Sequence, residues 1–417
     1  MLKQIDTNDI KIGMYVAQLD RPWLDTPFIF QGFLLESEQH IKEVQNFCSY
    51  VFIDIKKGLD TDALLPDSRI FASPPHLKPT RVYIDTTPLE DEIATAEALR
   101  ETAKNCIDNV FNAITENRDI DIKSVKKLVN NMVGSIVRNP DAQMCLTQLK
   151  NKDEYTAQHS INVCILTLTF GRHLGICENS LNLLGLGALL HDVGKIKTPL
   201  EILNKPGRLT DEEFEIMKAH PEAGRKILKA TNEIPDSVID IALSHHERLG
   251  GHGYPRGLPD DQISPWSKMV AITDVYDAIT SDRCYHDGMS PTQALTKMYE
   301  WRIKDFNPEL LEQFIQCIGI YPIGTLVELT SGEVGIVISV NKEMRLKPKI
   351  LLILDEFKNP YYPTHIINLT DYHQESNDNA YNIQAVLEPR SYNINTNDYM
   401  HEIKQAQQKQ MSKEVNN

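Results

Sequence analysis

The sequence lacks closely spaced cysteines. Its seven cysteines are scattered along the chain, and no two of them form a Cys-x-x-Cys pair. An odd number of widely spaced cysteines is typical of reduced thiols, whereas a disulfide framework or a structural zinc site needs paired residues. The chain also lacks an apolar run of the roughly 20 residues that cross a bilayer, and its first residues contain no apolar signal-peptide core. We therefore expect a cytoplasmic protein without a membrane span.

Positive charge is also scarce. The 417 residues include 43 Lys and Arg against 58 Asp and Glu, which gives a formal net charge of −15. An acidic protein does not bind polyanions through a broad basic surface, so we expect no binding of DNA or RNA. If the substrate is a small phosphate ester, metal ions must supply the local positive charge. The length is sufficient for two to four domains.

The first 75 residues have the composition of a small α/β domain. Residues 10–19, 28–35 and 50–55 are strand-like, and residues 38–47 could form a short helix between them. This region contains neither a phosphate-binding glycine loop nor a cluster of titratable residues. We predict that residues 1–75 form an accessory domain for interaction or sensing.

A linker and a helical hairpin are predicted for residues 76–144. Apolar residues recur at spacings of three and four from 93 to 114, and again from 122 to 136 after a polar break. Such stripes either pack the hairpin on the next domain or form the interface of a homodimer. The spacing alone does not separate these two interpretations.

The remaining chain changes from helical to strand-like periodicity. Residues 145–320 are predicted almost wholly helical, and Thr210 with Glu213 predicts a capping box for the helix that carries His220. Residues 321–372 show a period of two, which indicates a small β extension, and residues 373–417 form a polar tail. The predicted fold class is thus a mainly α catalytic domain with a small α/β N-terminal domain and a small β extension.

Eight of the thirteen histidines fall between residues 159 and 286. This region contains two pairs of adjacent residues that can bind metals, His191-Asp192 and His245-His246. Imidazoles with a few carboxylates suit Fe, Mn or Zn. Neighbours on a helix point about 100° apart, so each pair can serve two ions, and Asp192 could bridge them. Two ions about 3.5–4 Å apart promote the in-line displacement of a phosphodiester, and Lys195 could neutralise a phosphate oxygen. A lone histidine such as His159 is by itself more often a core residue than a ligand.

The same region carries six motifs in a fixed order. They are Tyr155-Thr-Ala-Gln-His159-Ser, His191-Asp192-Val-Gly-Lys195, His220-Pro221, His245-His246-Glu247-Arg248, Gly253-Tyr254-Pro255 and Thr273-Asp274-Val-Tyr-Asp277-Ala-Ile-Thr-Ser281-Asp282-Arg283. In order, spacing and identity these motifs resemble the HD-GYP family, a branch of the HD-domain metal-dependent phosphohydrolases. The small N-terminal domain and the C-terminal extension also resemble a common architecture of that family.

The resemblance implies a helical-bundle enzyme that hydrolyses cyclic di-GMP, a bacterial second messenger, to pGpG and then often to GMP. It implies two divalent metal ions, with iron favoured and manganese as the usual substitute, and Asp192 and Lys195 as catalytic residues. Lys195 and Arg283 would contact phosphates. Gly253, Tyr254 and Pro255 would shape a loop beside the metals that is linked to contacts with GGDEF-domain proteins. The implied metal ligands are His159, His191, Asp192, His220, His245, His246 and Asp274.

The sequence departs from the family pattern at two places. Members with a third metal have a glutamate one turn before the first histidine, where this chain has Tyr155, so we expect a two-metal centre. Beyond Arg283, Cys284 and His286 replace a proline and a basic residue, which would weaken phosphate affinity or admit another cyclic dinucleotide such as cyclic GMP–AMP. A second hypothesis is a sensor that binds cyclic di-GMP without turnover. A third keeps the enzyme but changes the substrate to cyclic GMP–AMP or a nucleotide monophosphate, and the Gly-Tyr-Pro loop disfavours the monophosphate.

Overall fold

The computed structural model describes residues 2–20, 33–35, 38–55, 81–148, 155–281, 288–302, 304–341, 344–372, 381–388, 391–394 and 399. The chain divides into two compact units, Met1–Lys78 and Pro79–Asn417. No helix in these ranges combines the length and hydrophobicity that a bilayer crossing requires.

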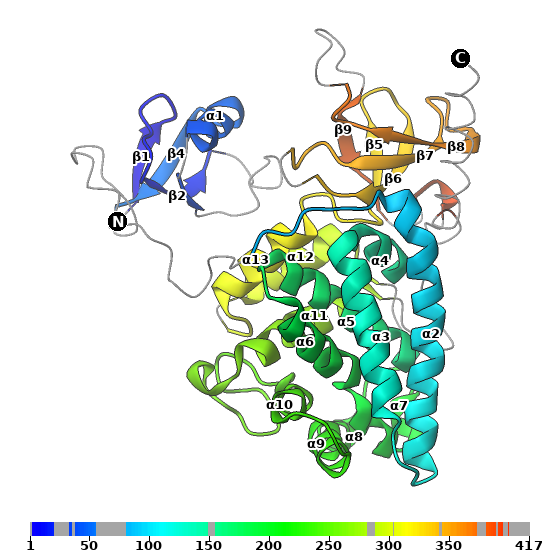
Figure 1. The fold of residues 1–417 in the computed structure, drawn as a ribbon. Helices are drawn as coiled ribbons and strands as arrows, with labels where there is room; N and C mark the ends of the chain where they lie inside the picture. Colours follow the sequence, from blue (N-terminus) through cyan, green and yellow to red (C-terminus); the bar gives the residue numbers. More distant parts are fainter. Residues whose placement is uncertain are drawn as a thin grey trace. The chain divides into compact units, whose positions relative to one another are not determined.

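The first unit is a four-stranded antiparallel sheet with one helix (Figure 1). Its elements are β1 (Leu2–Asp6), β2 (Tyr15–Leu19), β3 (Phe33–Leu34), α1 (Glu38–Phe47) and β4 (Tyr50–Asp54), in the sheet order β1-β4-β2-β3. Along β4, Val51 and Ile53 are fully buried while Tyr50 is exposed, as the period of two in a strand requires. They pack with Val44 of α1 in a core of their own.

The second unit is mainly helical. Its helices are α2 (Leu89–Thr115), α3 (Ile122–Arg138), α4 (Pro140–Thr147), α5 (Tyr155–His173), α6 (Glu178–Leu190), the 3₁₀ helix η3 (Val193–Lys197), α7 (Leu200–Leu203), α8 (Asp211–Met217), α9 (His220–Ala230), α10 (Asp236–Ser244), the 3₁₀ helix η4 (Asp260–Gln262), α11 (Pro265–Thr280), α12 (Pro291–Trp301) and α13 (Pro308–Ile318). Helix α5 is central, because α2, α3, α4, α6, α11 and α13 all contact it. A helix surrounded on all sides is apolar all round, which explains the run Ile161 to Phe170.

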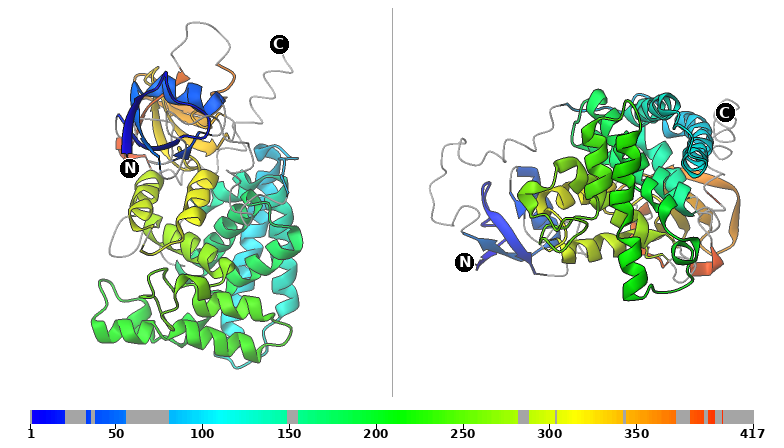
Figure 2. Two further views of the ribbon diagram at one scale, coloured as in Figure 1. Left: turned by 90° about the vertical axis from the view of Figure 1, so that its left-hand side faces the viewer. Right: turned by 90° about the horizontal axis from the view of Figure 1, so that it is seen from below.

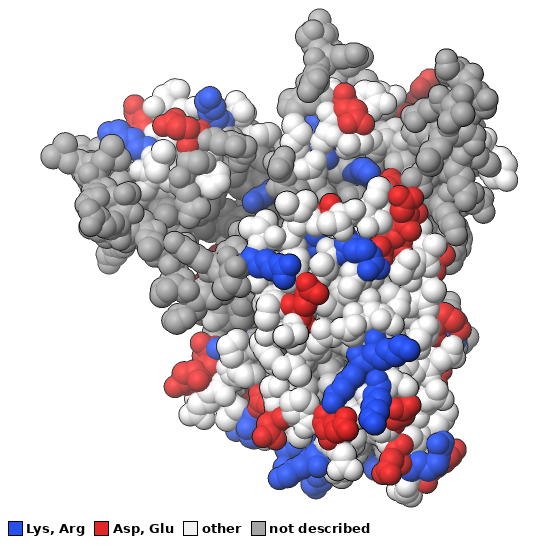
Figure 3. Space-filling view, in the orientation of Figure 1, with Lys and Arg blue, Asp and Glu red and all other residues white. Residues whose placement is uncertain are grey.

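Helices α2 and α3 form the predicted hairpin and lie side by side (Figures 1 and 2, cyan). Ile93, Ile107 and Val110 of α2 are buried, and so are Val125 and Val129 of α3. The stripes are buried against α4, α5 and α6 of the same unit. Intrachain packing therefore accounts for both apolar stripes. Over the face that carries these helices, Lys and Arg are interleaved with Asp and Glu (Figure 3).

One predicted helix is divided in two. The capping box forms as predicted, since Thr210 Oγ1 accepts a hydrogen bond from Glu213 N (3.3 Å) and Glu213 Oε2 accepts one from Thr210 N (2.7 Å). However, this helix, α8, ends at Met217, and His220 opens the next helix, α9. The prediction that the capped helix carries His220 is therefore wrong. Pro221 gives the reason, because a proline has no N–H and its ring clashes with the carbonyl of residue i−4 inside a helix.

The C-terminal part is a five-stranded antiparallel sheet. Its strands are β5 (Leu326–Leu329), β6 (Val334–Ser339), β7 (Lys349–Leu354), β8 (Pro360–Asn368) and β9 (Ile383–Val386), in the order β8-β7-β6-β5-β9, with the 3₁₀ helix η6 (Ser391–Asn393) after them. Ser339 donates to Asp141 Oδ2 (2.5 Å) and Lys349 contacts Glu90 (3.3 Å), which ties the sheet to α4 and α2. The predicted fold class is confirmed. Strand β9 lies in the segment expected as a polar tail and is ordered by pairing with β5.

The ion pair between Glu92 of α2 and Arg138 of α3 provides a test of the hairpin. Glu92 is buried, and Arg138 donates to both of its oxygens (2.8 and 2.7 Å). We expect Arg138→Met to lower the free energy of unfolding of the second unit by about 2 kcal/mol, because a buried carboxylate loses its donors. Denaturant unfolding followed by circular dichroism measures this. Arg118→Met, which breaks an exposed pair with Glu116, is the control and should cost less than about 0.5 kcal/mol. Equal effects of the two variants would contradict the expectation.

Candidate metal centre

Three histidines of the centre lie at or just beyond the C-terminus of a helix. His191 follows α6, His220 comes shortly after α8, and His245 follows α10. The last carbonyls of a helix have no partner inside it. Each histidine uses one of them, because its Nδ1 donates to the carbonyl oxygen of the residue three positions earlier, at 2.6, 2.8 and 3.0 Å respectively. Since Nδ1 carries the hydrogen, Nε2 is left with a lone pair that can bind a metal.

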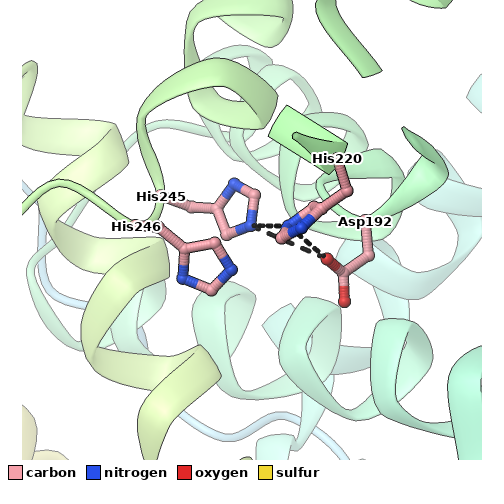
Figure 4. Close-up of side chains that lie close together, drawn as sticks. All are labelled: Asp192, His220, His245 and His246. Atoms are coloured by element: carbon pink, nitrogen blue, oxygen red, sulfur yellow. Dashed lines mark hydrogen bonds and ion pairs between the residues drawn. The ribbon is translucent and has the colours of Figure 1, made fainter. Parts of the chain in front are cut away.

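These Nε2 atoms converge on Asp192 from two sides. The distances from Asp192 Oδ1 are 3.3 Å to His220 Nε2 and 3.7 Å to His245 Nε2. Its other oxygen, Oδ2, lies 3.2 Å from His191 Nε2 and 3.6 Å from His159 Nε2. Figure 4 shows Asp192, His220 and His245 pointing toward one another. One carboxylate thus faces a different pair of imidazoles with each oxygen.

Two groups of possible ligands result. One contains Asp192, His220, His245 and His246, and the other contains His159, His191 and Asp192. Within each group the ligand atoms lie within 4.8 Å of one another. Asp274 of α11 lies between the groups, because its Oδ1 is 3.0 Å from His159 Nε2 and its Oδ2 is 3.8 Å from His246 Nδ1. All seven predicted ligands therefore meet in one place.

Gly194 and Lys195 lie in the 3₁₀ helix η3, which begins directly after Asp192. Helix η3 folds Lys195 back so that its Nζ contacts Asp192 Oδ2, while its side chain stays 18% exposed. Gly194 lies against the start of α9, and a Cβ at this position would come within 2.0 Å of His220 O and 2.4 Å of Gly224 N. Only glycine permits this approach, which brings Asp192 and His220 together.

The site holds its carboxylates ionised and two of its histidines neutral. Burial opposes ionisation of Asp192, but the charge of Lys195 and the contacts with His191 and His220 outweigh it and hold its pKa well below the usual range. Burial lowers the pKa of His245 to about 4 despite the nearby Asp192, and burial together with the adjacent His245 holds the pKa of His246 well below its ordinary value. Carboxylate and neutral imidazole are the forms that bind metals.

His159 differs from the other histidines. Burial opposes its protonation, but hydrogen bonds to Asp274 and Asp277 outweigh it and raise its pKa to about 9. Its Nδ1 lies 2.7 Å from Asp277 Oδ2, so its orienting partner is a side chain rather than a carbonyl. The raised pKa means that a cation binding at Nε2 must displace a proton, and metal binding then releases that proton.

The residues present fit a divalent metal ion. His191 Nε2 and Asp192 Oδ1 are buried and have no hydrogen-bond partner among the residues that the structure describes. A buried polar atom without a partner is costly, and a cation held at both atoms would remove that cost. Imidazole nitrogen with carboxylate oxygen is the ligand set that iron, manganese and zinc share.

The Gly253-Tyr254-Pro255 loop covers one side of the centre. The ring of Tyr254 lies on that of His246, with centroids 4.6 Å apart and an interplanar angle of 31°. Glu247 holds this loop, because its buried carboxylate accepts hydrogen bonds from Arg256 N (2.8 Å) and Leu258 N (2.9 Å). A Cβ on Gly253 would come within 2.4 Å of Arg248 N. The loop therefore contacts the centre through Tyr254.

Some of the residues singled out from the sequence lie outside the part of the chain that the structure describes. Arg283, Cys284 and His286 lie outside the described residues, and so does the side chain of Tyr155. Sequence reasoning gave no role to Asp277 or Glu247. Asp277 stands three positions after Asp274 on α11, a spacing that puts both on one helix face, so this signal was available. Glu247 had no comparable signal, because its partners are backbone N–H groups of the loop.

Three family models match the chain. A model described as an HD domain matches residues 143–310, which contain every candidate ligand. A domain of unknown function, DUF3391, matches residues 2–125, and a KOW domain associated with the HD domain matches residues 326–393. The KOW match covers the five-stranded sheet, including β9.

Several curated proteins are similar to this chain. A cyclic di-GMP phosphodiesterase of Pseudomonas aeruginosa is 37% identical over 379 residues, which is 88% of this chain and 89% of that protein. A cyclic di-GMP phosphodiesterase of Thermotoga maritima is 39% identical over 166 residues, 40% of this chain and 45% of that protein. A 3'3'-cGAMP-specific phosphodiesterase of Vibrio cholerae is 33% identical over 171 residues, 41% of this chain and 37% of that protein.

The close packing at Gly194 gives a test of the centre that leaves every ligand in place. We expect Gly194→Ala to weaken Mn²⁺ binding roughly tenfold or more, because the added methyl group must separate His220 from Asp192. Isothermal titration of the metal-free chain with Mn²⁺ measures the affinity. Gly134→Ala is the matched control, since the nearest atom to its Cβ would lie 3.6 Å away. Wild-type affinity in the Gly194→Ala variant would show that this contact does not hold the ligands together.

Proposed function

The chain belongs to the HD-GYP family of HD-domain phosphohydrolases, and we propose that it is a metal-dependent phosphodiesterase that hydrolyses cyclic di-GMP to pGpG, GMP or both. The observation that carries the proposal is the position of Asp192, whose two oxygens face different pairs of imidazoles. In this arrangement Asp192 and the imidazoles on either side of it would hold two divalent ions.

We propose that iron occupies the centre, with manganese as the alternative. The proposed ligands are His159, His191, Asp192, His220, His245, His246 and Asp274. Held by these residues, a pair of divalent ions would supply the Lewis acidity that activates water and stabilises a leaving oxygen in phosphodiester hydrolysis. The low pKa of Asp192 and of Asp274 keeps both carboxylates ionised for this purpose.

The chain's own cations and loop would orient the substrate. Lys195 is partly exposed at the edge of the centre, so we propose that its ammonium group binds a non-bridging phosphate oxygen. Arg283 is proposed as a second phosphate contact on the family resemblance alone. Burial raises the pKa of Tyr254 above its ordinary value, so its phenol stays protonated and can donate a hydrogen bond to a nucleotide bound beside the loop of Gly253, Tyr254 and Pro255.

The proposal extends to the setting of the enzyme. We propose that residues 1–75 act as an accessory module, that the Gly253-Tyr254-Pro255 loop contacts GGDEF-domain proteins, and that the protein works in the cytoplasm. A homodimer would have to use a surface other than the apolar stripes of α2 and α3, because those are buried within the chain.

Asp192 provides the direct test of the enzyme. The full chain loaded anaerobically with Fe(II), or with Mn(II), should linearise cyclic di-GMP, as measured by chromatography of the products. Asp192→Ala should abolish turnover and lower the bound metal, because both ligand groups lose their shared carboxylate. Asp261→Ala, on an exposed residue, is the control and should retain both. A wild-type chain that binds stoichiometric metal and cyclic di-GMP but cleaves no cyclic dinucleotide would establish the sensor instead.

A mixed dinucleotide is the second candidate substrate. It is favoured by the similarity to the cGAMP-specific phosphodiesterase of Vibrio cholerae. Comparing kcat/KM for cyclic di-GMP and 3'3'-cGAMP on the same metal-loaded preparation separates the two. We expect the kcat/KM for cyclic di-GMP to be the higher of the two. A higher kcat/KM for 3'3'-cGAMP would identify the mixed dinucleotide as the substrate instead.

A further inference from the structure

Helix α2 carries one cation toward the metal centre. Arg100 lies on the side of α2 that faces α5, and its Nη2 donates to Gln158 Oε1 at 2.7 Å. Burial lowers the pKa of Arg100 to about 10, although the charge of Asp277 partly opposes this. The guanidinium therefore remains charged at neutral pH. Gln158 directly precedes His159, so Arg100 contacts the residue next to a proposed metal ligand. The sequence motifs alone did not connect α2 with the centre.

A continuous series of hydrogen bonds runs from Arg100 to His159. Gln158 Nε2 donates to Asn162 Oδ1 at 2.6 Å, and Asn162 Nδ2 donates to Asp277 Oδ1 at 3.0 Å. The other oxygen of Asp277 lies 2.7 Å from His159 Nδ1. Gln158 and Asn162 stand one helical turn apart on α5, so their side chains meet on one face of the helix.

The two ends of this series fix its direction. A guanidinium can only donate hydrogen bonds, and an ionised carboxylate can only accept them. Gln158 and Asn162 must therefore both turn their oxygen toward Arg100 and their nitrogen toward Asp277. Reversing either amide would bring two acceptors or two donors together. Asp277 is thereby held as the acceptor for His159 Nδ1, which leaves His159 Nε2 facing Asp274 at 3.0 Å.

His159 needs such a device because of where it lies. His191, His220 and His245 take unpaired carbonyls at helix ends, but His159 lies inside α5, where the carbonyls are engaged in the helix itself. We propose that Arg100 is a positioning residue of the metal centre, which holds Asp277 and His159 in their metal-binding orientation through the amides of Gln158 and Asn162. The proposal rests on the proposed function only in taking the centre to bind metal.

Mn²⁺ titration of the metal-free full chain, without any nucleotide, tests this role. We expect Arg100→Met to weaken Mn²⁺ binding about tenfold, the lower end of the usual effect of outer-shell partners. Arg100→Lys, which keeps a charged donor, should restore most of the affinity. A charge effect alone has the opposite sign, because removing a cation near the centre would strengthen the binding of another cation. Weaker binding therefore identifies positioning.

Gln158→Glu tests the direction of the series with little change in size. A glutamate cannot donate to Asn162, so the Asn162 amide must reverse and present its oxygen to Asp277. We expect weaker Mn²⁺ binding here too, although an added negative charge would by itself strengthen it. Arg118→Met, on an exposed arginine of the same hairpin, is the control and should bind Mn²⁺ as the wild type does.

The outcomes separate this proposal from the proposed function. Thermal unfolding of the metal-free variants checks that they fold. If Arg100→Met does not fold, the Mn²⁺ affinities of Arg100→Lys and Gln158→Glu test the positioning role. Wild-type or stronger Mn²⁺ binding in the folded Gln158→Glu and Arg100→Met variants would overturn the positioning role. A wild-type chain that binds Mn²⁺ but cleaves no cyclic dinucleotide would overturn the enzyme and leave this inference standing.

Discussion

The second unit depends on one buried carboxylate being approached by four imidazoles. Asp192 is almost completely buried, and Nε2 atoms of His191, His159, His220 and His245 lie within 3.7 Å of its two oxygens. A buried charge is tolerated only when it is paired. Because the imidazoles come from different helices, the ends of α6, α8 and α10 and the first turns of α5 must all meet at this point, and the apolar core around α5 holds them there.

The centre obtains its orientation from the way helices end. A helix leaves its last carbonyls unpaired, and His191, His220 and His245 each donate Nδ1 to one of them. The same contact satisfies the helix end and fixes which ring nitrogen faces the metal. His159, inside α5, instead has the side chain of Asp277 as the partner of its Nδ1. The backbone thus orients His191, His220 and His245, and a network of side chains orients His159.

Local sequence signals predicted the parts of this structure that depend on near neighbours. The sequence predicted the apolar stripes of α2 and α3, the Thr210 capping box and the alternation in β4, because each of these depends on contacts within a few residues. The division between α8 and α9 was missed although Pro221 marks it. Strand β9 could not be predicted from its polar surroundings, because its order comes from pairing with β5, far away in the sequence.

The sequence by itself determined which residue types gather in the centre and in which order the chain presents them, because motif order and spacing carry that information. The tertiary structure alone decided which oxygen of Asp192 faces which histidines, that Glu247 holds the loop, and that Arg100 reaches the centre. The Arg100–Gln158 and Asn162–Asp277 hydrogen bonds join residues 58 and 115 positions apart. Helical periodicity fixes the face of a residue on its own helix, but only the packing of helices decides which faces meet.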